Sequence, residues 1–228
     1  MEQIPQYTIY RSNRKTIRLT VRLNGTLAVY CPKRCSKKVL DEFVLKHYER
    51  LLENYNKNVP KLYKTANGQD SLPYFGKYYP IIRSETAIPT FDGSSFYIPK
   101  ALSDNDVRIW YQKLLRKKAK EIILPKVSHF AEKHSFKYNS VRIKAIYSRW
   151  GSCSAKANLN FSLALAACEE KFVDYVILHE LCHTVHMNHS KSFYALLNSV
   201  CPEYKSIQES KKRQYSLIMK AIHCQPSL

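Results

Sequence analysis

The sequence lacks any hydrophobic run long enough to cross a membrane. A spanning helix needs about 20 consecutive apolar residues, and no stretch of the 228 residues approaches that length. The first residues, Met1 to Pro5, also lack the basic and apolar segments of a secretory signal peptide. With 45% hydrophobic residues, the chain still has ample material for a buried core. These features predict a soluble cytoplasmic protein without a membrane partner.

The seven cysteines lack the paired C-x-x-C spacing of zinc ribbons and redox motifs. Their odd number and scattered positions argue against a disulfide framework. Internal repeats and low-complexity segments are absent as well. The cysteines are therefore expected to be reduced thiols. The length of the chain allows one large domain or two small ones.

Acidic residues are scarce relative to basic ones. The sequence has 18 Asp and Glu against 37 Lys and Arg, which gives a net charge of +19. Residues 1–100 carry +9 of this excess and residues 101–228 carry +10, so the charge belongs to the folded body and not to a tail. A basic surface attracts polyanions such as nucleic acid, or an anionic substrate such as a nucleotide. A basic surface without a dedicated partner is the alternative, because net charge alone specifies nothing.

One stretch carries a pattern with a definite chemistry, since residues 179–183 read H-E-L-C-H. On a helix, His179 and His183 leave the same face one turn apart and are able to hold one metal ion. Glu180 lies about 100° round the helix, where it reaches a water on the metal without taking a coordination position. The largely apolar run 172–178 turns this face inward, where an unligated imidazole pair would be costly to desolvate. The pattern predicts a hydrolytic metal site.

The third metal ligand is harder to assign, because His186 and His189 both follow the motif. In a continuous helix, His186 would lie roughly 10 Å along the axis from His179, too far for one ion held at about 2.1 Å by each nitrogen. His189 is able to ligate only if the chain turns after His183. Ser190 is suited to cap a new helix after such a turn, and His189 is therefore preferred. The fallback ligands are two carboxylates further along the chain, Glu203 and Glu209.

Residues 1–100 are predicted to form a β-rich N-terminal subdomain with one helix. Asn24-Gly25, between two alternating apolar runs, is a strong hairpin signal, and Ser36 is suited to cap the helix. The predicted elements are strands over 7–10, 16–23 and 26–30, a helix over 37–57, and short β runs around 72–82 and 95–98, which Gly76, Pro80 and Gly93 interrupt.

Residues 101–228 are predicted to form a zincin-like catalytic domain. Ser103 and Asp106 resemble a capping box that opens a helix, which Pro125 is expected to kink or split. An edge strand beside the metal would hold an extended peptide by main-chain pairing. The other predicted elements are strands over 141–146 and 159–165, the helix that carries His179 and His183, a helix that begins at Ser190, and a helix over about 203–220. The fold class is α+β, in which the β-rich part packs on a minimal zincin core of an active-site helix and a small antiparallel sheet.

The chain resembles a known family over nearly its whole length. The segments that carry the resemblance are R-W-G-S-C at 149–153, the run 174–183, N-H-S at 188–190, R-S-N-R-K-T-I at 11–17 and L-P-Y-F-G at 72–76. They are similar to the YgjP-like family of zincin metal-dependent hydrolases, which is related to the SprT-like metallopeptidases. The resemblance implies a zinc ion held by His179, His183 and His189, with Glu180 as the catalytic residue.

Three functions are compatible with these residues. The first is a zinc peptidase, in which Glu180 acts as general base on a metal-activated water that attacks a peptide or protein substrate. The second is a metal-dependent nucleotide pyrophosphohydrolase, an activity also attributed to the family. The third is a nucleic-acid-associated protein, which is either a SprT-like protease or a nucleic-acid-binding protein with structural zinc. Structural zinc normally has four protein ligands, which argues against the nucleic-acid-binding protein. The candidates for substrate contact or oxyanion stabilisation are Arg149, Trp150, His186, Tyr194 and Tyr204.

Overall fold

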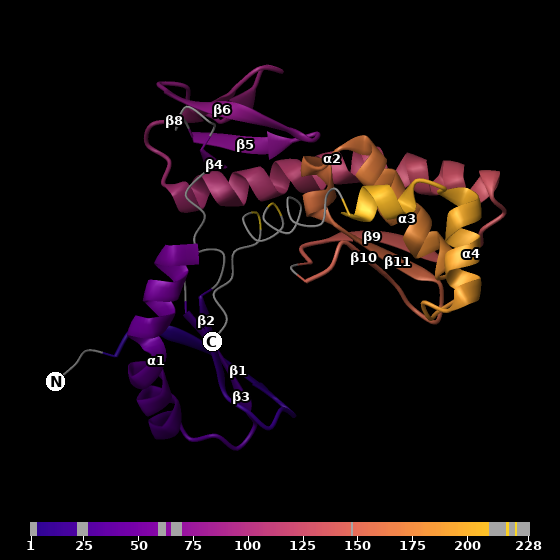
Figure 1. Ribbon diagram of the computed structural model, residues 1–228. Coiled ribbons are helices and arrows are strands. Elements are labelled where there is room, and N and C mark those ends of the chain that lie inside the picture. The colour runs from indigo at the N-terminus through magenta and orange to yellow at the C-terminus, as the bar shows by residue number, and fades with distance from the viewer. Residues whose placement is uncertain are drawn as a thin grey trace.

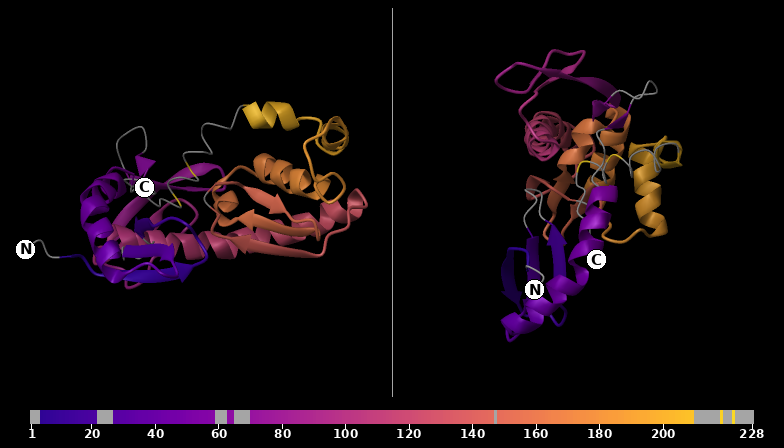
Figure 2. Two further views of the ribbon diagram at one scale, coloured as in Figure 1. Left: turned by 90° about the horizontal axis from the view of Figure 1, so that it is seen from below. Right: turned by 90° about the vertical axis from the view of Figure 1, so that its left-hand side faces the viewer.

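The structure is a computed structural model, and its helices and strands form an N-terminal unit and a larger second unit (Figures 1 and 2). The residues that it describes are 4–21, 27–58, 63–64, 70–146, 148–209, 218 and 222. Within these residues the mixture of helices and small sheets is consistent with the predicted α+β class.

The N-terminal unit is a three-stranded sheet with one helix on it. Its elements are β1 (Tyr7–Ser12), β2 (Arg18–Val21), β3 (Leu27–Pro32) and α1 (Lys37–Asn58). The strand order is β1-β3-β2, with β2 antiparallel and β1 parallel to β3. Leu19 and Val29 pack against Leu40 and Val44 of α1 in a separate small core. The predicted strands and helix are confirmed, while the turn at Asn24-Gly25 lies outside the described residues.

The second sheet packs on the longest helix of the chain. Its strands, in the order β4-β5-β6-β8-β7, are β4 (Tyr63–Lys64), β5 (Asp70–Tyr74), β6 (Lys77–Ser84), β8 (Phe96–Pro99) and β7 (Thr90–Phe91). The helix is α2 (Asp104–Lys133). The ring of Phe96 lies between those of Tyr74 and Tyr111, with centroids 5.9 and 6.1 Å away. Aromatic packing thus joins this sheet to α2.

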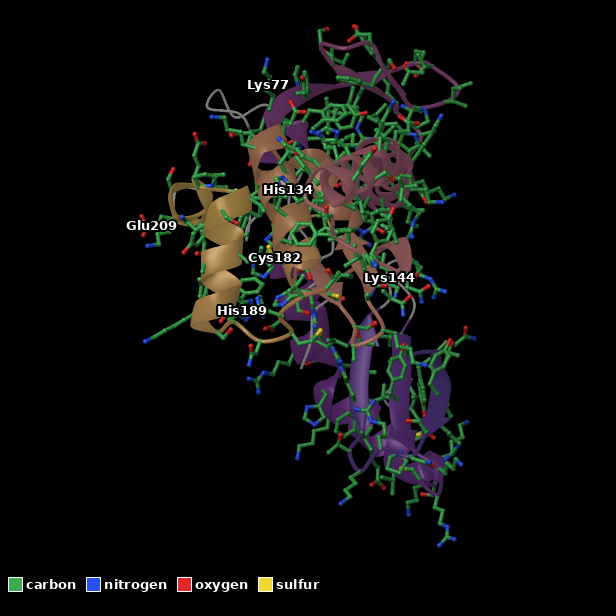
Figure 3. The ribbon with its side chains drawn as sticks, turned by 90° about the vertical axis from the view of Figure 1, so that its right-hand side faces the viewer. Lys77, His134, Lys144, Cys182, His189 and Glu209 are labelled. Carbon is green, nitrogen blue, oxygen red and sulfur yellow. The ribbon has the colours of Figure 1, made fainter. Side chains whose placement is uncertain are left out.

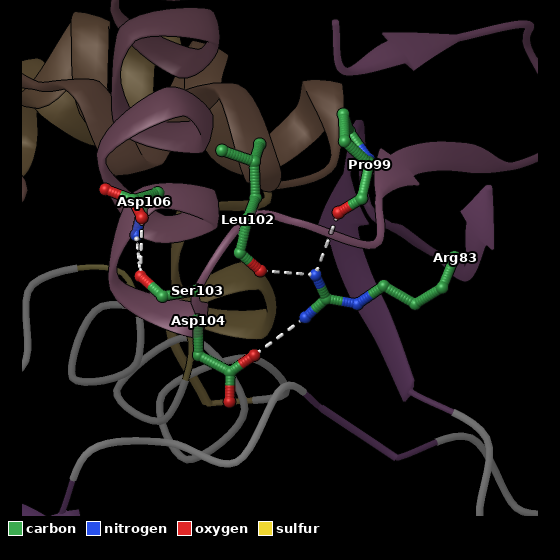
Figure 4. A network of polar contacts seen from close by, with 6 residues as sticks. All are labelled: Arg83, Pro99, Leu102, Ser103, Asp104 and Asp106. Carbon is green, nitrogen blue, oxygen red and sulfur yellow. Dashed lines mark hydrogen bonds and ion pairs between the residues drawn. The ribbon is translucent and has the colours of Figure 1, made fainter. Parts of the chain in front are cut away.

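A polar network fixes the start of α2 (Figure 4). Ser103 is the N-cap, and its hydroxyl accepts a bond from the backbone N–H of Asp106, as the capping-box pattern predicted. Arg83, at the end of β6, donates to the carbonyl of Leu102 at 2.8 Å and pairs with Asp104 at 2.8 Å. These contacts therefore fix the position of the start of α2 relative to the end of β6.

Of the two predicted effects of Pro125, splitting is wrong, because α2 runs unbroken from Asp104 to Lys133. A kink at this position stays a prediction. Proline removes a backbone donor and crowds the preceding turn, but Ile123 and Val127 on either side of it are buried in the core. The helix packs there against the 3₁₀ helix η1 (Leu163–Ala167) and α3 (Glu170–Cys182). Tertiary packing outweighs the local cost of the proline.

The third sheet is mixed, and the prediction of an antiparallel sheet is wrong. Its strands are β9 (Ser140–Lys144), β10 (Gly151–Cys153) and β11 (Asn158–Ser162), in the order β10-β11-β9. β9 and β11 are parallel, and only β10 is antiparallel to β11. The connection between the two predicted strands contains β10 and is long enough for the chain to reverse twice. The second predicted strand also ends early, at Ser162, because Leu163 and Leu165 belong to η1.

The second unit has one continuous core around α2, α3 and η1, and residues 70–99 contribute to it. Figure 1 shows α2 between the second sheet on one side and the third sheet with α3 and α4 (Lys191–Val200) on the other. The division at residue 100 stays a prediction, but this packing favours placing residues 70–99 with the second unit. Residues 204–209 are helical, and most of the helix predicted to reach residue 220 lies outside the described residues.

Candidate metal centre

Helix α3 brings two of the motif side chains to the inner face of the second unit. It begins after η1 and contributes a buried stripe that includes Phe172 and Val176. His179 and Glu180 lie in its last turn, and His183 is its C-cap residue. The apolar stripe therefore decides which way the motif faces.

The chain turns sharply after His183, as the assignment of His189 requires. The backbone N–H of His186 bonds to the carbonyl of Cys182, and α3 ends there. Ser190 then caps α4 by accepting a bond from the N–H of Phe193 at 3.3 Å, as predicted. This stop and restart returns His189 to the end of α3.

The imidazoles of His179, His183 and His189 converge on one point. The Nε2 atom of His179 lies 3.2 Å from that of His183 and 3.1 Å from that of His189. Nitrogens about 2.1 Å from one tetrahedral ion would lie about 3.4 Å apart. The three side chains are thus spaced as a group that is able to hold a single metal ion.

The donor set also fits a cation chemically. The Nδ1 atom of His183 lies 3.0 Å from the carbonyl oxygen of His186. A carbonyl only accepts, so Nδ1 carries the proton and Nε2 keeps its lone pair. Burial, with repulsion from His183 and His189, lowers the pKa of His179 to about 3, and burial lowers the pKa of His183. The inner imidazoles are neutral near pH 7, and their facing lone pairs would repel one another without a cation between them.

Glu180 is buried beside this triad with one oxygen unsatisfied. Its side chain is only 6% exposed, and Oε2 has no hydrogen-bond partner among the described residues. Burial raises the pKa of Glu180 to about 8, and the charge of Arg149 opposes this rise. Burying a carboxyl oxygen without a hydrogen-bond partner costs stability, and such a perturbed group in a cleft is typical of a functional site.

A cleft of about 420 Å³ opens over the triad and Glu180. Its volume is in the range of small-molecule and peptide side-chain sites. Strand β10 forms one wall and α3 the opposite one. The lining residues that join the triad and Glu180 are Arg149, Trp150, Gly151, Ser152, Cys153, Tyr175, Val176 and Met187.

Of the five candidates for substrate contact, the structure brings Arg149 and Trp150 to the cleft. Trp150 also packs edge-on against Phe172, with ring centroids 5.2 Å apart. The lining described for the cleft does not include the other three, His186, Tyr194 and Tyr204. His186 instead contributes its backbone carbonyl to His183, and Tyr194 stacks between the rings of His189 and Tyr204.

The fallback carboxylates do not join the triad. The Oε2 atom of Glu203 lies 3.7 Å from the Nζ atom of Lys171. Among the described residues, the group of side chains able to bind a metal consists of the three histidines. Glu209 is exposed at the end of the short helical segment 204–209, on the far side of α4 from the sheet (Figure 3). Neither glutamate takes the place predicted as a fallback.

Sequence reasoning missed two residues that shape the site. Gly151 lies so close to Glu180 that a β-carbon on it would be 2.6 Å from the Glu180 carboxylate oxygen. Phe193 is fully buried, and its ring lies 4.6 to 5.0 Å from all three imidazole centroids. A glycine inside a strand often marks such a close approach, and an apolar residue three places after a helix cap faces inward. The signal for Phe193 was present in the sequence, whereas that for Gly151 appears only once residues 151–153 are known to form β10.

A protein-family model described as "YgjP-like, metallopeptidase domain" matches residues 15–214. The chain belongs to the YgjP-like family. The resemblance predicted from the sequence is thereby confirmed. No curated protein and no solved structure matches the chain.

Membership of the YgjP-like family supports a metal-dependent hydrolase of the metallopeptidase kind. A metallopeptidase domain implies a divalent metal, and the triad of His179, His183 and His189 is the group in the described chain that is able to bind one. No helix among the described residues is long and apolar enough to span a membrane.

Proposed function

We propose that this protein is a zinc-dependent peptidase that hydrolyses peptide bonds in extended polypeptide segments. The observation that carries the proposal is the convergence of His179, His183 and His189 beside the buried carboxyl of Glu180, whose Oε2 atom has no hydrogen-bond partner among the described residues. The core around α3 is then a minimal zincin-like one.

The three histidines would hold the metal through their Nε2 atoms. Neutral imidazoles suit zinc, and three protein ligands leave a coordination position open, as in catalytic zinc sites. When bound, zinc supplies Lewis acidity, which polarises a carbonyl and lowers the pKa of water. The His186 carbonyl holds the ring of His183 in the tautomer that presents Nε2.

Glu180 acts as general base and then as general acid. Its carboxylate accepts a proton from the attacking water and returns it to the nitrogen of the leaving amine. No described side chain competes for its Oε2 atom, so this oxygen remains available for the transfer. Arg149, at the cleft wall, is placed to stabilise negative charge that develops on the carbonyl oxygen.

Strand β10 is suited to bind the substrate backbone. It is an edge strand; Trp150 and Ser154 bond to β11, and Ser152 faces Asn160 in register between them. In an antiparallel pair, alternate residues direct their backbone groups to opposite edges. Gly151 and Cys153 therefore direct their N–H and C=O groups away from β11, and both line the cleft. An extended peptide would add to this edge as a further strand.

The experiment is a cleavage assay with zinc-loaded protein on an unfolded protein and, separately, on nucleoside triphosphates. Wild type is expected to cleave the unfolded protein, and Glu180→Gln to lose this activity while it keeps its zinc. Glu132→Gln, an exposed glutamate on α2, is the matched control and should behave as wild type. The proposal fails if Glu180→Gln cleaves the protein at the wild-type rate.

A nucleotide pyrophosphohydrolase is the second candidate function. Arg149 in the lining of the cleft favours it, because arginine recognises phosphate oxygens in two-point contacts. This candidate replaces the first if the nucleotide alone is hydrolysed and the hydrolysis requires Glu180.

A further inference from the structure

The N-terminal unit has an unusual distribution of charge. Between Glu2 and Asp41 the sequence contains no acidic residue, although it contains nine lysines and arginines. Most solvated protein surfaces carry both signs of charge interspersed. The strands β1, β2 and β3 therefore contain no acidic residue, and β1 and β2 carry one arginine each, Arg11 and Arg18.

The two faces of the sheet β1-β3-β2 differ in character. Leu19 and Val29 lie opposite each other and pack on α1. The next row across the sheet consists of Tyr10, Tyr30 and Arg18, which are in register. Because side chains alternate along a strand, this row lies on the face away from α1. Figure 1 shows α1 on one side of the sheet only.

This row presents aromatic rings between arginines. The rings of Tyr10 and Tyr30 stack with centroids 5.0 Å apart and planes inclined by 24°. The guanidinium of Arg14 lies over the Tyr30 ring, 6.0 Å from its centroid. Arg18, on the other side of Tyr30, and Lys15 are exposed. The two half-buried rings, Arg14 and Arg18 thus form one surface, with Lys15 next to Arg14 in the chain. We call this surface the tyrosine–arginine row.

We propose that the tyrosine–arginine row binds single-stranded nucleic acid. Arginine and lysine attract the phosphates, and an unpaired base extends the stack of the two tyrosine rings. A duplex keeps its bases stacked on one another and offers none to a flat sheet. The row lies in a different unit from the metal centre, so this binding goes beyond the proposed peptidase function and does not depend on it.

The experiment measures the binding of fluorescent oligonucleotides of about 15 nucleotides, both DNA and RNA, by anisotropy at several salt concentrations. The double variant Lys15→Gln/Arg18→Gln tests the phosphate contacts. Its affinity should fall, and the slope of log K against log salt should decrease by about 1.4, or 0.7 for each lost contact. Tyr10→Leu tests stacking and should weaken binding about 5- to 150-fold. The ratio of the affinities for the DNA and the RNA oligonucleotide shows which of the two nucleic acids the surface prefers.

The matched control is Lys113→Gln/Lys117→Gln, which removes two exposed cations from α2. It should bind as wild type does. The proposal is overturned if this control weakens binding as much as the N-terminal variant, or if duplex DNA or inorganic polyphosphate competes as well as the single strand. The Lys15 and Arg18 side chains are exposed, so their variant tests the proposal even if Tyr10→Leu fails to fold. Glu180→Gln should bind normally, which separates this result from any failure of the peptidase proposal.

Discussion

The side chain of Glu180 lies directly against the backbone of Gly151, and a β-carbon at position 151 would come within 2.6 Å of the carboxylate oxygen. Gly151→Ala should therefore displace Glu180 without removing it. A displacement of about 1 Å at a catalytic group costs about 100-fold in rate, and we expect a loss of peptide cleavage of that order with unchanged zinc content. Gly93→Ala, where an added β-carbon would meet nothing within 4 Å, is the matched control and should cleave the peptide as wild type does. Wild-type activity in Gly151→Ala would show that this contact does not hold Glu180 in its catalytic position.

The geometry of the triad predicts that replacing His183 abolishes zinc binding and that replacing His186 does not. His183→Ala should lose zinc and also lose the rise in melting temperature that zinc gives to wild type, because a ligand that binds only the folded state stabilises it. A zinc concentration of about 100 times the dissociation constant corresponds to about 2.7 kcal/mol. His186→Ala should keep both properties, since it retains the backbone carbonyl that bonds to His183. Elemental analysis and thermal unfolding check this, and equal zinc loss in both variants would contradict it.

The tip of the hairpin β5–β6 fixes the start of the active-site helix. Gly76 has φ +77°, and a β-carbon there would lie 2.3 Å from Cγ and 3.0 Å from Cα of Glu169, the N-cap of α3. Gly93 also has a positive φ, +96°, but free space around it. Gly93→Ala thus measures backbone strain alone, of order 1 kcal/mol. We expect Gly76→Ala to cost about 1 to 3 kcal/mol more in urea unfolding; equal costs would mean that the contact is unimportant.

Lys126 joins α2 to α3 through ion pairs of 2.7 Å with Glu170 and 2.8 Å with Asp174. Lys126→Met should reduce the free energy of unfolding by about 0.2 to 1 kcal/mol for each pair, because they are partly exposed. The hydrogen bond from Lys126 lowers the pKa of Glu170 in the folded state. The stabilisation by the pair of Lys126 and Glu170 is therefore complete above the ordinary pKa of a glutamate. It is lost as the pH falls through the lowered pKa of Glu170 in the folded state.

The measurement is the difference in unfolding free energy between wild type and Lys126→Met from pH 7 to pH 3. The difference should be constant down to about pH 5 and should shrink below it. Lys100→Met, which breaks a more exposed pair with Glu85, is the control and should have little effect. A difference that grows on acidification would contradict this assignment.

The metal helix and its neighbours could be predicted from the sequence because local patterns determine them. The spacing of His179 and His183 on an apolar stripe fixes their common face, and Ser190 marks the restart that returns His189. The capping box at Ser103 was found for the same reason. Each of these features depends on residues within a few positions of one another.

Strand pairing could not be predicted in the same way. The alternation in β9 and β11 shows which side chains share a face, but it does not specify the partner or the direction of pairing. The parallel pairing of these strands and the insertion of β10 beside β11 depend on contacts distant in sequence. Gly151 is one consequence, because its importance arises only where β10 meets α3. The continuity of α2 through Pro125 likewise depends on η1 and α3 packing against it.

The most direct test of the metal centre is a crystal structure of the zinc-loaded protein with anomalous data at the zinc edge. A single peak should lie within about 2.1 Å of the Nε2 atoms of His179, His183 and His189, with no fourth protein ligand and with Glu180 beside the open position. A peak at another site, or one closed by a fourth side chain such as that of Glu203, would contradict the account.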